Sequence, residues 1–217
     1  MHWQLAIFDL DGTILNTLED LADSLNVALR KAAYPERTLD EVRRFVGNGI
    51  RKLIERGVPA GTETADVDRV QKDFMAHYQA HCADKTRPYP GVEELLLALR
   101  AAGYRTAVVS NKADVAVKPL CQDYFPGLFD AAVGERPGIL KKPAPDSVNE
   151  VLRLLNVPRE QAVYIGDSEV DVQTAKNAGM AGILVDWGFR SRAFLQEQGA
   201  RTIVSSAKEL KKLLLEE

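Results

Sequence analysis

The most constraining feature of the sequence is the uneven spacing of its short apolar segments, which have the length and composition of buried strands. Such segments lie at residues 5–8, 106–109, 131–133, 163–165 and 183–185, with a weaker one at 202–204. From the second segment onward, strand ends follow one another at steps of 24, 33, 19 and 19 residues, which fits units of one strand and one helix. The first step, from Asp9 to Ser110, is 101 residues long, and about 70 of these exceed one crossover connection. We therefore expect an insertion between the first two strands.

Segments with helical periodicity separate the later strands, at residues 92–102, 115–122, 146–155, 170–178, 192–198 and 207–215. The strands are almost continuously apolar, without the alternation of a sheet that has one solvated face. This pattern indicates a parallel sheet covered by helices on both sides. The sequence therefore predicts an α/β fold with a doubly wound, Rossmann-like core.

The insertion, residues 15–85, contains no convincing strand but does contain helix starts. Thr17 and Thr38 each precede an acid by three residues, Asp20 and Glu41, which is the spacing of a capping box. We expect a small helical bundle here. The predicted domains are thus residues 1–14 with 86–217 for the core and 15–85 for a helical cap.

The composition excludes several classes of protein. With 46% hydrophobic and 27% charged residues, the chain is typical of a globular protein with a sizeable core. The net charge of −3 provides no positive surplus for a nucleic-acid backbone, although local cations can still bind a small anion. No apolar run reaches the ~18 residues of a membrane helix, and no Lys or Arg precedes Arg30 to begin a secretory signal. We expect a cytoplasmic monomer or homodimer without nucleic-acid or membrane partners.

Two acids, Asp9 and Asp11, follow the first strand and lead into a glycine turn. At the carboxyl end of a parallel strand they lie where ligands bind in open α/β folds. One can act as a nucleophile and metal ligand, and the other as a general acid if its surroundings raise its pKa. Taken alone, such a pair is more often a turn with two exposed acids.

Three further segments follow later strands. Ser110 and Asn111, before a predicted helix start, can hold phosphate oxygens. Lys142, fixed beside a proline, can neutralise a transferring phosphoryl group. Asp167 is a hard oxygen ligand suited to Mg²⁺, and Asp171, one helical turn later, can orient it. Each segment alone fits a helix cap or an exposed loop, but together they predict a phosphoryl-transfer centre.

The four segments resemble, in composition and order, the motifs of the haloacid dehalogenase superfamily: FDLDGTILNT, VSNK, KKPAPD and GDSEVD. The resemblance implies that Asp9 attacks phosphorus and forms a phosphoaspartate. It implies that Asp11 protonates the leaving oxygen and then activates water. Ser110 and Lys142 are expected to hold the phosphoryl oxygens.

The same resemblance implies a Mg²⁺ site made by the Asp9 carboxylate, the Asp11 backbone carbonyl and Asp167, with Asp171 in support. Thr13 and Asn111, within the first two motifs, are expected to contact substrate.

The predicted cap contains Gly47, Asn48, Gly49 and Arg51, in a segment similar to the cap of phosphoglycolate phosphatases. The glycines allow unusual backbone angles and Asn48 can cap the next helix, so that free amides and Arg51 can face a small carboxylate. A plain turn between two helices explains the segment about as well. His77 and His81, four residues apart, indicate a packed or solvated helix face rather than a zinc site.

The leading hypothesis is a Mg²⁺-dependent phosphatase acting on a small phosphorylated metabolite, with 2-phosphoglycolate as the first candidate substrate. A pyrophosphatase or a β-phosphoglucomutase of the same superfamily is the nearer alternative. A non-enzymatic phospho-receiver switch is the remote one, because receivers accept the group at the third strand and lack a long insertion after the first.

Overall fold

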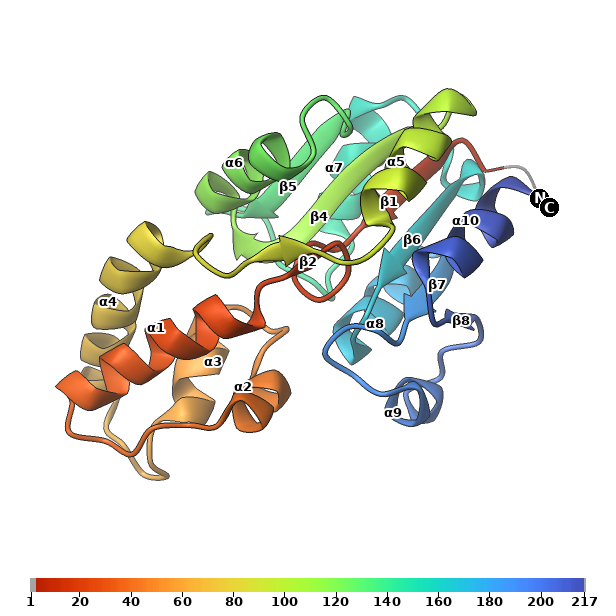
Figure 1. Cartoon of the computed structure of the whole chain (residues 1–217). Coiled ribbons are helices and arrows are strands. Elements are labelled where there is room, and N and C mark those ends of the chain that lie inside the picture. Colours follow the sequence, from red (N-terminus) through yellow and green to blue (C-terminus); the bar gives the residue numbers. More distant parts are fainter. Residues whose placement is uncertain (1–2, 217) are drawn as a thin grey trace. The chain divides into compact units, whose positions relative to one another are not determined.

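The structure is a computed structural model that describes residues 3–216. It divides into two compact units (Figure 1). The sheet unit comprises Met1–Leu15 and Pro88–Glu217, and the helical unit comprises Asn16–Arg87. The chain therefore leaves the sheet unit after its first strand and returns before its second.

A parallel sheet forms the centre of the sheet unit. Within the described residues it has six strands in the order β5-β4-β1-β6-β7-β8, and the neighbouring strands pair in parallel. The predicted doubly wound parallel sheet is confirmed, because the chain moves outward from β1 first to one side and then to the other. The strands are β1 (Leu5–Phe8), β4 (Arg105–Ala113), β5 (Ala131–Glu135), β6 (Ala162–Gly166), β7 (Ala181–Val185) and β8 (Ile203–Val204).

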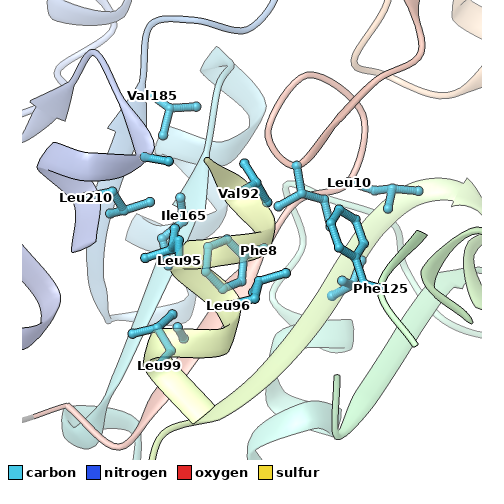
Figure 2. Packing of buried hydrophobic residues seen from close by; sticks show 14 of the residues in the cluster. Phe8, Leu10, Val92, Leu95, Leu96, Leu99, Phe125, Ile165, Val185 and Leu210 are labelled. Carbon is cyan, nitrogen blue, oxygen red and sulfur yellow. The ribbon is translucent and has the colours of Figure 1, made fainter. Parts of the chain in front are cut away.

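Helices cover both faces of this sheet. Residues of α5, α6 and α10 pack on one face in a cluster that includes Phe8 and Ile165. Figure 2 shows part of this cluster, with residues of α5 and α10 labelled. Residues of α7 and α8 pack on the opposite face around Ile7 and Tyr164. The helices are α5 (Val92–Ala101), α6 (Asp114–Tyr124), α7 (Asp146–Leu154), α8 (Glu169–Ala178), α9 (Arg192–Glu197) and α10 (Ala207–Leu215), with a 3-10 turn at Arg159–Gln161.

The central position of β1 in the sheet explains why this strand is apolar at every residue. Ala6 and Phe8 point into one cluster, whereas Leu5 and Ile7 point into the other, as side chains of a strand alternate between faces. All four are at most 1% exposed. A central strand buried on both sides thus ends directly at Asp9.

The helical unit contains α1 (Leu18–Lys31), α2 (Leu39–Phe45), α3 (Ile50–Gly57) and α4 (Thr64–His81), and α1 packs most extensively against α4. Two short strands, β2 (Leu15–Asn16) and β3 (Arg87–Pro88), pair with each other where the chain enters and leaves this unit. The expectation that residues 15–85 hold no strand is wrong at β2. A two-residue strand is too short to leave a pattern in the sequence. Within residues 3–216, no helix is long and apolar enough to span a membrane.

The two predicted capping boxes have different outcomes. Thr38 and Glu41 form one at the start of α2, with reciprocal side-chain and backbone bonds. Thr17 is the N-cap of α1 by position, but its side chain makes no capping bond. Asp20 instead accepts hydrogen bonds from the backbone amides of Lys85 and Thr86 at 2.9 and 2.8 Å. This acid therefore secures the segment that leaves the helical unit.

Candidate active site

The first predicted motif places a buried carboxylate at the end of the central strand. Asp9 accepts a hydrogen bond from its neighbour's amide, Leu10 N, at 2.7 Å, and its Oδ2 lies 2.8 Å from Lys142 Nζ. Loss of solvent on burial raises the pKa of Asp9 to about 7, although Lys142 opposes the shift. Residues of the first and third motifs are therefore in direct contact.

Lys142 joins the first motif to the fourth. Its Nζ lies 2.9 Å from Asp171 Oδ1 and donates to the phenol oxygen of Tyr164 at 3.0 Å. Burial acts to lower the pKa of Lys142, but Asp171 and Asp9 outweigh it and hold the pKa well above its usual value. The lysine is 3% exposed, so a permanent buried cation faces the two acids.

Tyr164 is a site residue that the sequence analysis did not identify. Its hydroxyl donates to Asp171 Oδ1 at 3.0 Å while it accepts from Lys142. Burial raises the pKa of Tyr164 well above its usual value, so the phenol stays protonated. The one signal in the sequence is a hydroxyl-bearing residue in the middle of an apolar strand, which more often marks an ordinary core position.

Asp171 is held from two sides. Its Oδ2 accepts from Ser168 Oγ at 2.7 Å and from the amides of Ser168 and Asp167 at 3.1 and 3.2 Å. Burial acts to raise the pKa of Asp171, but the charge of Lys142 and these hydrogen bonds lower it below its usual value. The acid thus both closes the first turn of α8 and faces the site.

Asp167 is closely surrounded by two glycines, a backbone amide and a hydroxyl group. Its Oδ2 accepts from Phe189 N at 2.7 Å, and its Oδ1 accepts from the Thr13 hydroxyl at 3.2 Å. Gly12 has a φ of 87°, and a Cβ there would lie 2.4 Å from Asp167 Oδ2. A Cβ at Gly188 would lie 2.4 Å from the Asp167 Cβ. The close approach of the first and fourth motifs therefore requires glycine at both positions.

The acids are suited to a divalent cation. Asp9, Asp167 and Asp171 each offer a carboxylate oxygen, and these oxygens lie within 4.8 Å of one another. In the part of the chain that the structure describes, this is the one such group of metal-ligating side chains. Burial, with Asp171 and Asp9 nearby, raises the pKa of Asp167 well above its usual value. A hard cation would relieve this repulsion among oxygen ligands.

The second motif differs from its prediction. Ser110, Asn111 and Lys112 were expected between a strand and a helix start, but β4 continues to Ala113 and α6 begins only at Asp114. The strand is therefore longer than the predicted residues 106–109, whereas α6 begins within one residue of the helix predicted at 115–122. Asn111 Nδ2 donates to the Lys142 carbonyl at 3.1 Å, so the second motif supports the third.

Lys112 is the other site residue that the sequence analysis passed over. Its Nζ lies 2.9 Å from Asp11 Oδ1 and 3.2 Å from Asp11 Oδ2. Its backbone amide donates to Ser110 Oγ at 3.2 Å. The carboxylate of Asp11 thus faces a lysine, while the carboxylates of the other three acids gather in the buried group.

The predicted substrate residues of the helical unit make contacts within that unit. Gly47 and Gly49 have positive φ angles of 112° and 85°, which are unusual backbone angles of the kind predicted for them. Asn48 was expected to cap the next helix, but the N-cap of α3 is Gly49 and no side chain caps it. The structure shows Asn48 Oδ1 buried and without a hydrogen-bond partner among the described residues. Arg51 pairs with Glu55 at 2.9 Å and with Asp68, so its charge is already compensated.

The two histidines of the sequence analysis, and a further acid that follows a strand, have structural partners. His77 Nδ1 lies 2.9 Å from Ser24 Oγ, and His81 Nδ1 lies 2.8 Å from Asp84 Oδ2, which fits a packed and solvated helix face. Asp186, at the end of β7, pairs with Arg192 at 2.7 Å and lies outside the acid group.

The comparisons with known proteins agree with this geometry. Residues 6–185 match the family model of the haloacid dehalogenase-like hydrolases. A phosphoglycolate phosphatase of Mesorhizobium japonicum is 39% identical over 200 residues, which cover 88% of this chain and 86% of that protein. One from Cereibacter sphaeroides is 36% identical over 96% of both chains.

A solved structure shows the same fold. It is the crystal structure of a protein from Lactobacillus delbrueckii subsp. bulgaricus that is provisionally assigned as a phosphoglycolate phosphatase. Its TM-score is 0.96 with 41% identity, and the match covers 100% of both chains. The family match spans both the acids after β1 and the acids after β6, so the sequence, the fold and the site point to one conclusion. The chain belongs to the haloacid dehalogenase-like hydrolases.

Proposed function

We propose that the protein is a Mg²⁺-dependent phosphatase that hydrolyses a small phosphate monoester through a phosphoaspartate on Asp9, with 2-phosphoglycolate as the substrate. The observation that carries the proposal is the contact between Asp9 and Lys142 inside a buried group of acids. A nucleophile beside a fixed cation suits the attack of a carboxylate on an anionic phosphoryl group.

In the first step, a carboxylate oxygen of Asp9 forms a bond to phosphorus, and the bond from phosphorus to the ester oxygen breaks. Asp11 gives its proton to the departing alkoxide, so that a neutral alcohol leaves. In the second step, Asp11 takes a proton from water as the water oxygen attacks phosphorus. The acyl phosphate bond breaks, which restores Asp9 and releases inorganic phosphate. Covalent catalysis thereby divides one slow hydrolysis into two easier steps.

Lys142 and Ser110 are the groups that we assign to the phosphoryl oxygens. Lys142 is held in place by Asp171 and Tyr164, so its ammonium group is oriented before substrate arrives. Such preorganised charge is worth more in a water-poor site than in solvent.

Asp9 and Asp167 are the carboxylates that would hold Mg²⁺, together with the Asp11 carbonyl. Asp171 accepts hydrogen bonds from Lys142, Tyr164 and Ser168 and from the amides of Asp167 and Ser168, and this larger set of partners favours a supporting role for this acid. The cation supplies charge neutralisation for the phosphoryl group and for the acids around it.

The choice of 2-phosphoglycolate rests on the named activity of the relatives in Mesorhizobium japonicum and Cereibacter sphaeroides. The test is a panel of 2-phosphoglycolate, unrelated phosphate monoesters, pyrophosphate and β-glucose 1-phosphate, each assayed with and without Mg²⁺. We expect repeated release of phosphate from 2-phosphoglycolate, with the highest kcat/KM of the panel. A kcat/KM no better than for unrelated esters would overturn the substrate assignment.

The same panel separates the alternatives. Preferred cleavage of pyrophosphate, or conversion of β-glucose 1-phosphate to glucose 6-phosphate, would favour the corresponding relatives instead. Labelling of Asp9 without repeated phosphate release would favour a receiver switch. Hydrolysis that persists in Asp9→Asn would overturn the nucleophile assignment.

A further inference from the structure

Lys112 has no part in the mechanism described so far, although it pairs with Asp11, which does. The Lys112 side chain is 3% exposed and that of Asp11 is 22% exposed. The ammonium group of Lys112 lies 2.9 and 3.2 Å from the two carboxylate oxygens of Asp11. A buried lysine is costly unless its charge is matched, and the contact with Asp11 matches the charge of Lys112.

An irregularity in β4 brings Lys112 to this place. Val109 pairs with Val133 and Ala113 pairs with Glu135, so four steps along β4 match two steps along β5. The two extra residues interrupt the pairing between Val109 and Ala113, as in a β-bulge, which re-aims side chains next to a site.

Gly134 makes this irregularity possible. It lies between the two paired residues of β5, and a Cβ there would be 2.5 Å from the Lys112 carbonyl oxygen and from the Asp114 Cα. Its amide donates to Asp114 Oδ1 at 2.9 Å. The glycine is therefore the residue that permits the extra length of β4 beside it.

We propose that Lys112 is a positioning residue that fixes the Asp11 carboxyl group for proton transfer to the leaving oxygen. Contact with both carboxyl oxygens restrains rotation about the last bond of the aspartate side chain, which a single hydrogen bond does not do. The inference rests on the proposed function, because that function gives Asp11 its role. Loss of Lys112 therefore weakens acid catalysis and leaves phosphoryl binding by Lys142 and Ser110 in place.

The experiment compares two substrates that need the acid to different extents. The alkoxide released from 2-phosphoglycolate must be protonated, whereas nitrophenolate leaves p-nitrophenyl phosphate readily as an anion. The parameter is kcat/KM, which reports formation of the phosphoaspartate and not its later hydrolysis. In Lys112→Met we expect a loss of about 10- to 100-fold on 2-phosphoglycolate, and a much smaller loss on p-nitrophenyl phosphate. An equal loss on both substrates, or no loss, would overturn the inference.

A double-mutant cycle tests whether Lys112 acts through Asp11. Asp11→Asn and the double variant Asp11→Asn/Lys112→Met are expected to have the same kcat/KM on 2-phosphoglycolate. A further loss in the double variant would mean that Lys112 acts on the substrate itself, which contradicts a positioning role. The double variant removes both charges and so leaves neither of them unmatched, and far-UV circular dichroism checks that Asp11→Asn, in which Lys112 loses this partner, is folded.

Lys118→Met is the matched control. Lys118 is an exposed lysine that also pairs with an aspartate, Asp114, at 2.7 Å, and it is expected to keep wild-type kcat/KM on both substrates. Phosphate release by the wild type distinguishes failure of the proposed function from failure of the role proposed for Lys112. If the wild type releases no phosphate from either ester, the proposed function fails, whereas a uniform loss in Lys112→Met removes only the role of Lys112.

Discussion

Lys142 places its ammonium nitrogen 2.8 Å from a carboxylate oxygen of Asp9, although the whole helical unit lies between the two residues in the sequence. The parallel order of β1 and β6 brings the segments that follow these strands to one edge of the sheet. Asp167 and Asp171 come from the same edge, and Lys142 reaches it from the loop before α7. The contact joins the proposed nucleophile to the cation that would attract its substrate.

Replacing Asp9 with asparagine should remove turnover and leave the fold intact. Asparagine has nearly the same shape but is not a nucleophile, so kcat on 2-phosphoglycolate should fall by roughly a thousandfold or more. Phosphate release measures the activity, and urea denaturation with far-UV circular dichroism measures the fold. Glu197→Gln, a charge removal on α9 of the sheet unit, serves as the control and should keep full activity.

Removal of metal should abolish activity reversibly. Chelation leaves the buried acids without a compensating cation, and added Mg²⁺ should restore phosphate release and raise the midpoint of thermal unfolding. Asp167→Asn should raise the Mg²⁺ concentration for half-maximal activity by about 10-fold or more. Asp186→Asn changes another acid at a strand end, and it should leave the Mg²⁺ requirement unchanged. Full activity of the chelated wild type would contradict the metal assignment.

Tyr164→Phe should reduce both stability and activity. The phenol oxygen lies between Lys142 and Asp171, 3.0 Å from each, and its loss leaves two buried charged groups with one partner fewer. We expect a loss of about 1–3 kcal/mol in the free energy of unfolding and a lower kcat. Tyr104→Phe removes a buried phenol that donates to the Leu214 carbonyl, and Tyr104 precedes its strand whereas the acids follow theirs. It should lower stability alone, and an equal loss of kcat in both variants would count against a role for Tyr164 in the site.

Two neighbouring polar residues of the helical unit should respond in opposite ways. Asp20→Ala removes the acceptor for the amides of Lys85 and Thr86 and for the Thr86 hydroxyl, so the free energy of unfolding should fall by about 1–3 kcal/mol. Thr17→Val should be neutral or stabilising, because the Thr17 hydroxyl is buried and has no partner among residues 3–216. Urea denaturation of each variant measures the difference. A destabilised Thr17→Val would show that the hydroxyl has a partner in solution.

The parts of the site that follow from the sequence are those fixed by strand order. Asp9 and Asp167 follow apolar strands, and in a parallel sheet this alone places them at the same edge. Lys142 lies in a loop, yet its neighbouring proline and the order of the motifs indicated its place. For these residues, the position along the chain is enough to predict that they lie close together in the fold.

The residues that escaped prediction depend on a second segment of the chain. Lys112 faces Asp11 because β4 carries two extra residues that Gly134 of β5 permits, and neither strand reveals this by itself. Tyr164 has the spacing of a core residue, and only the neighbouring Lys142 makes its hydroxyl useful. The capping predicted for Thr17 failed because Asp20, the expected acid of the box, binds the amides of Lys85 and Thr86 instead.

The pairing of β2 with β3 makes the two ends of the helical unit neighbours. A segment whose ends are adjacent can be lengthened, shortened or exchanged without changing the register of the strands that flank it. Residues 16–87 can therefore be replaced as one segment, and the replacement leaves Asp9, Lys142 and Asp167 at the same edge of the sheet. Changes in length and sequence can then accumulate in residues 16–87 while the sheet edge keeps its side chains in place.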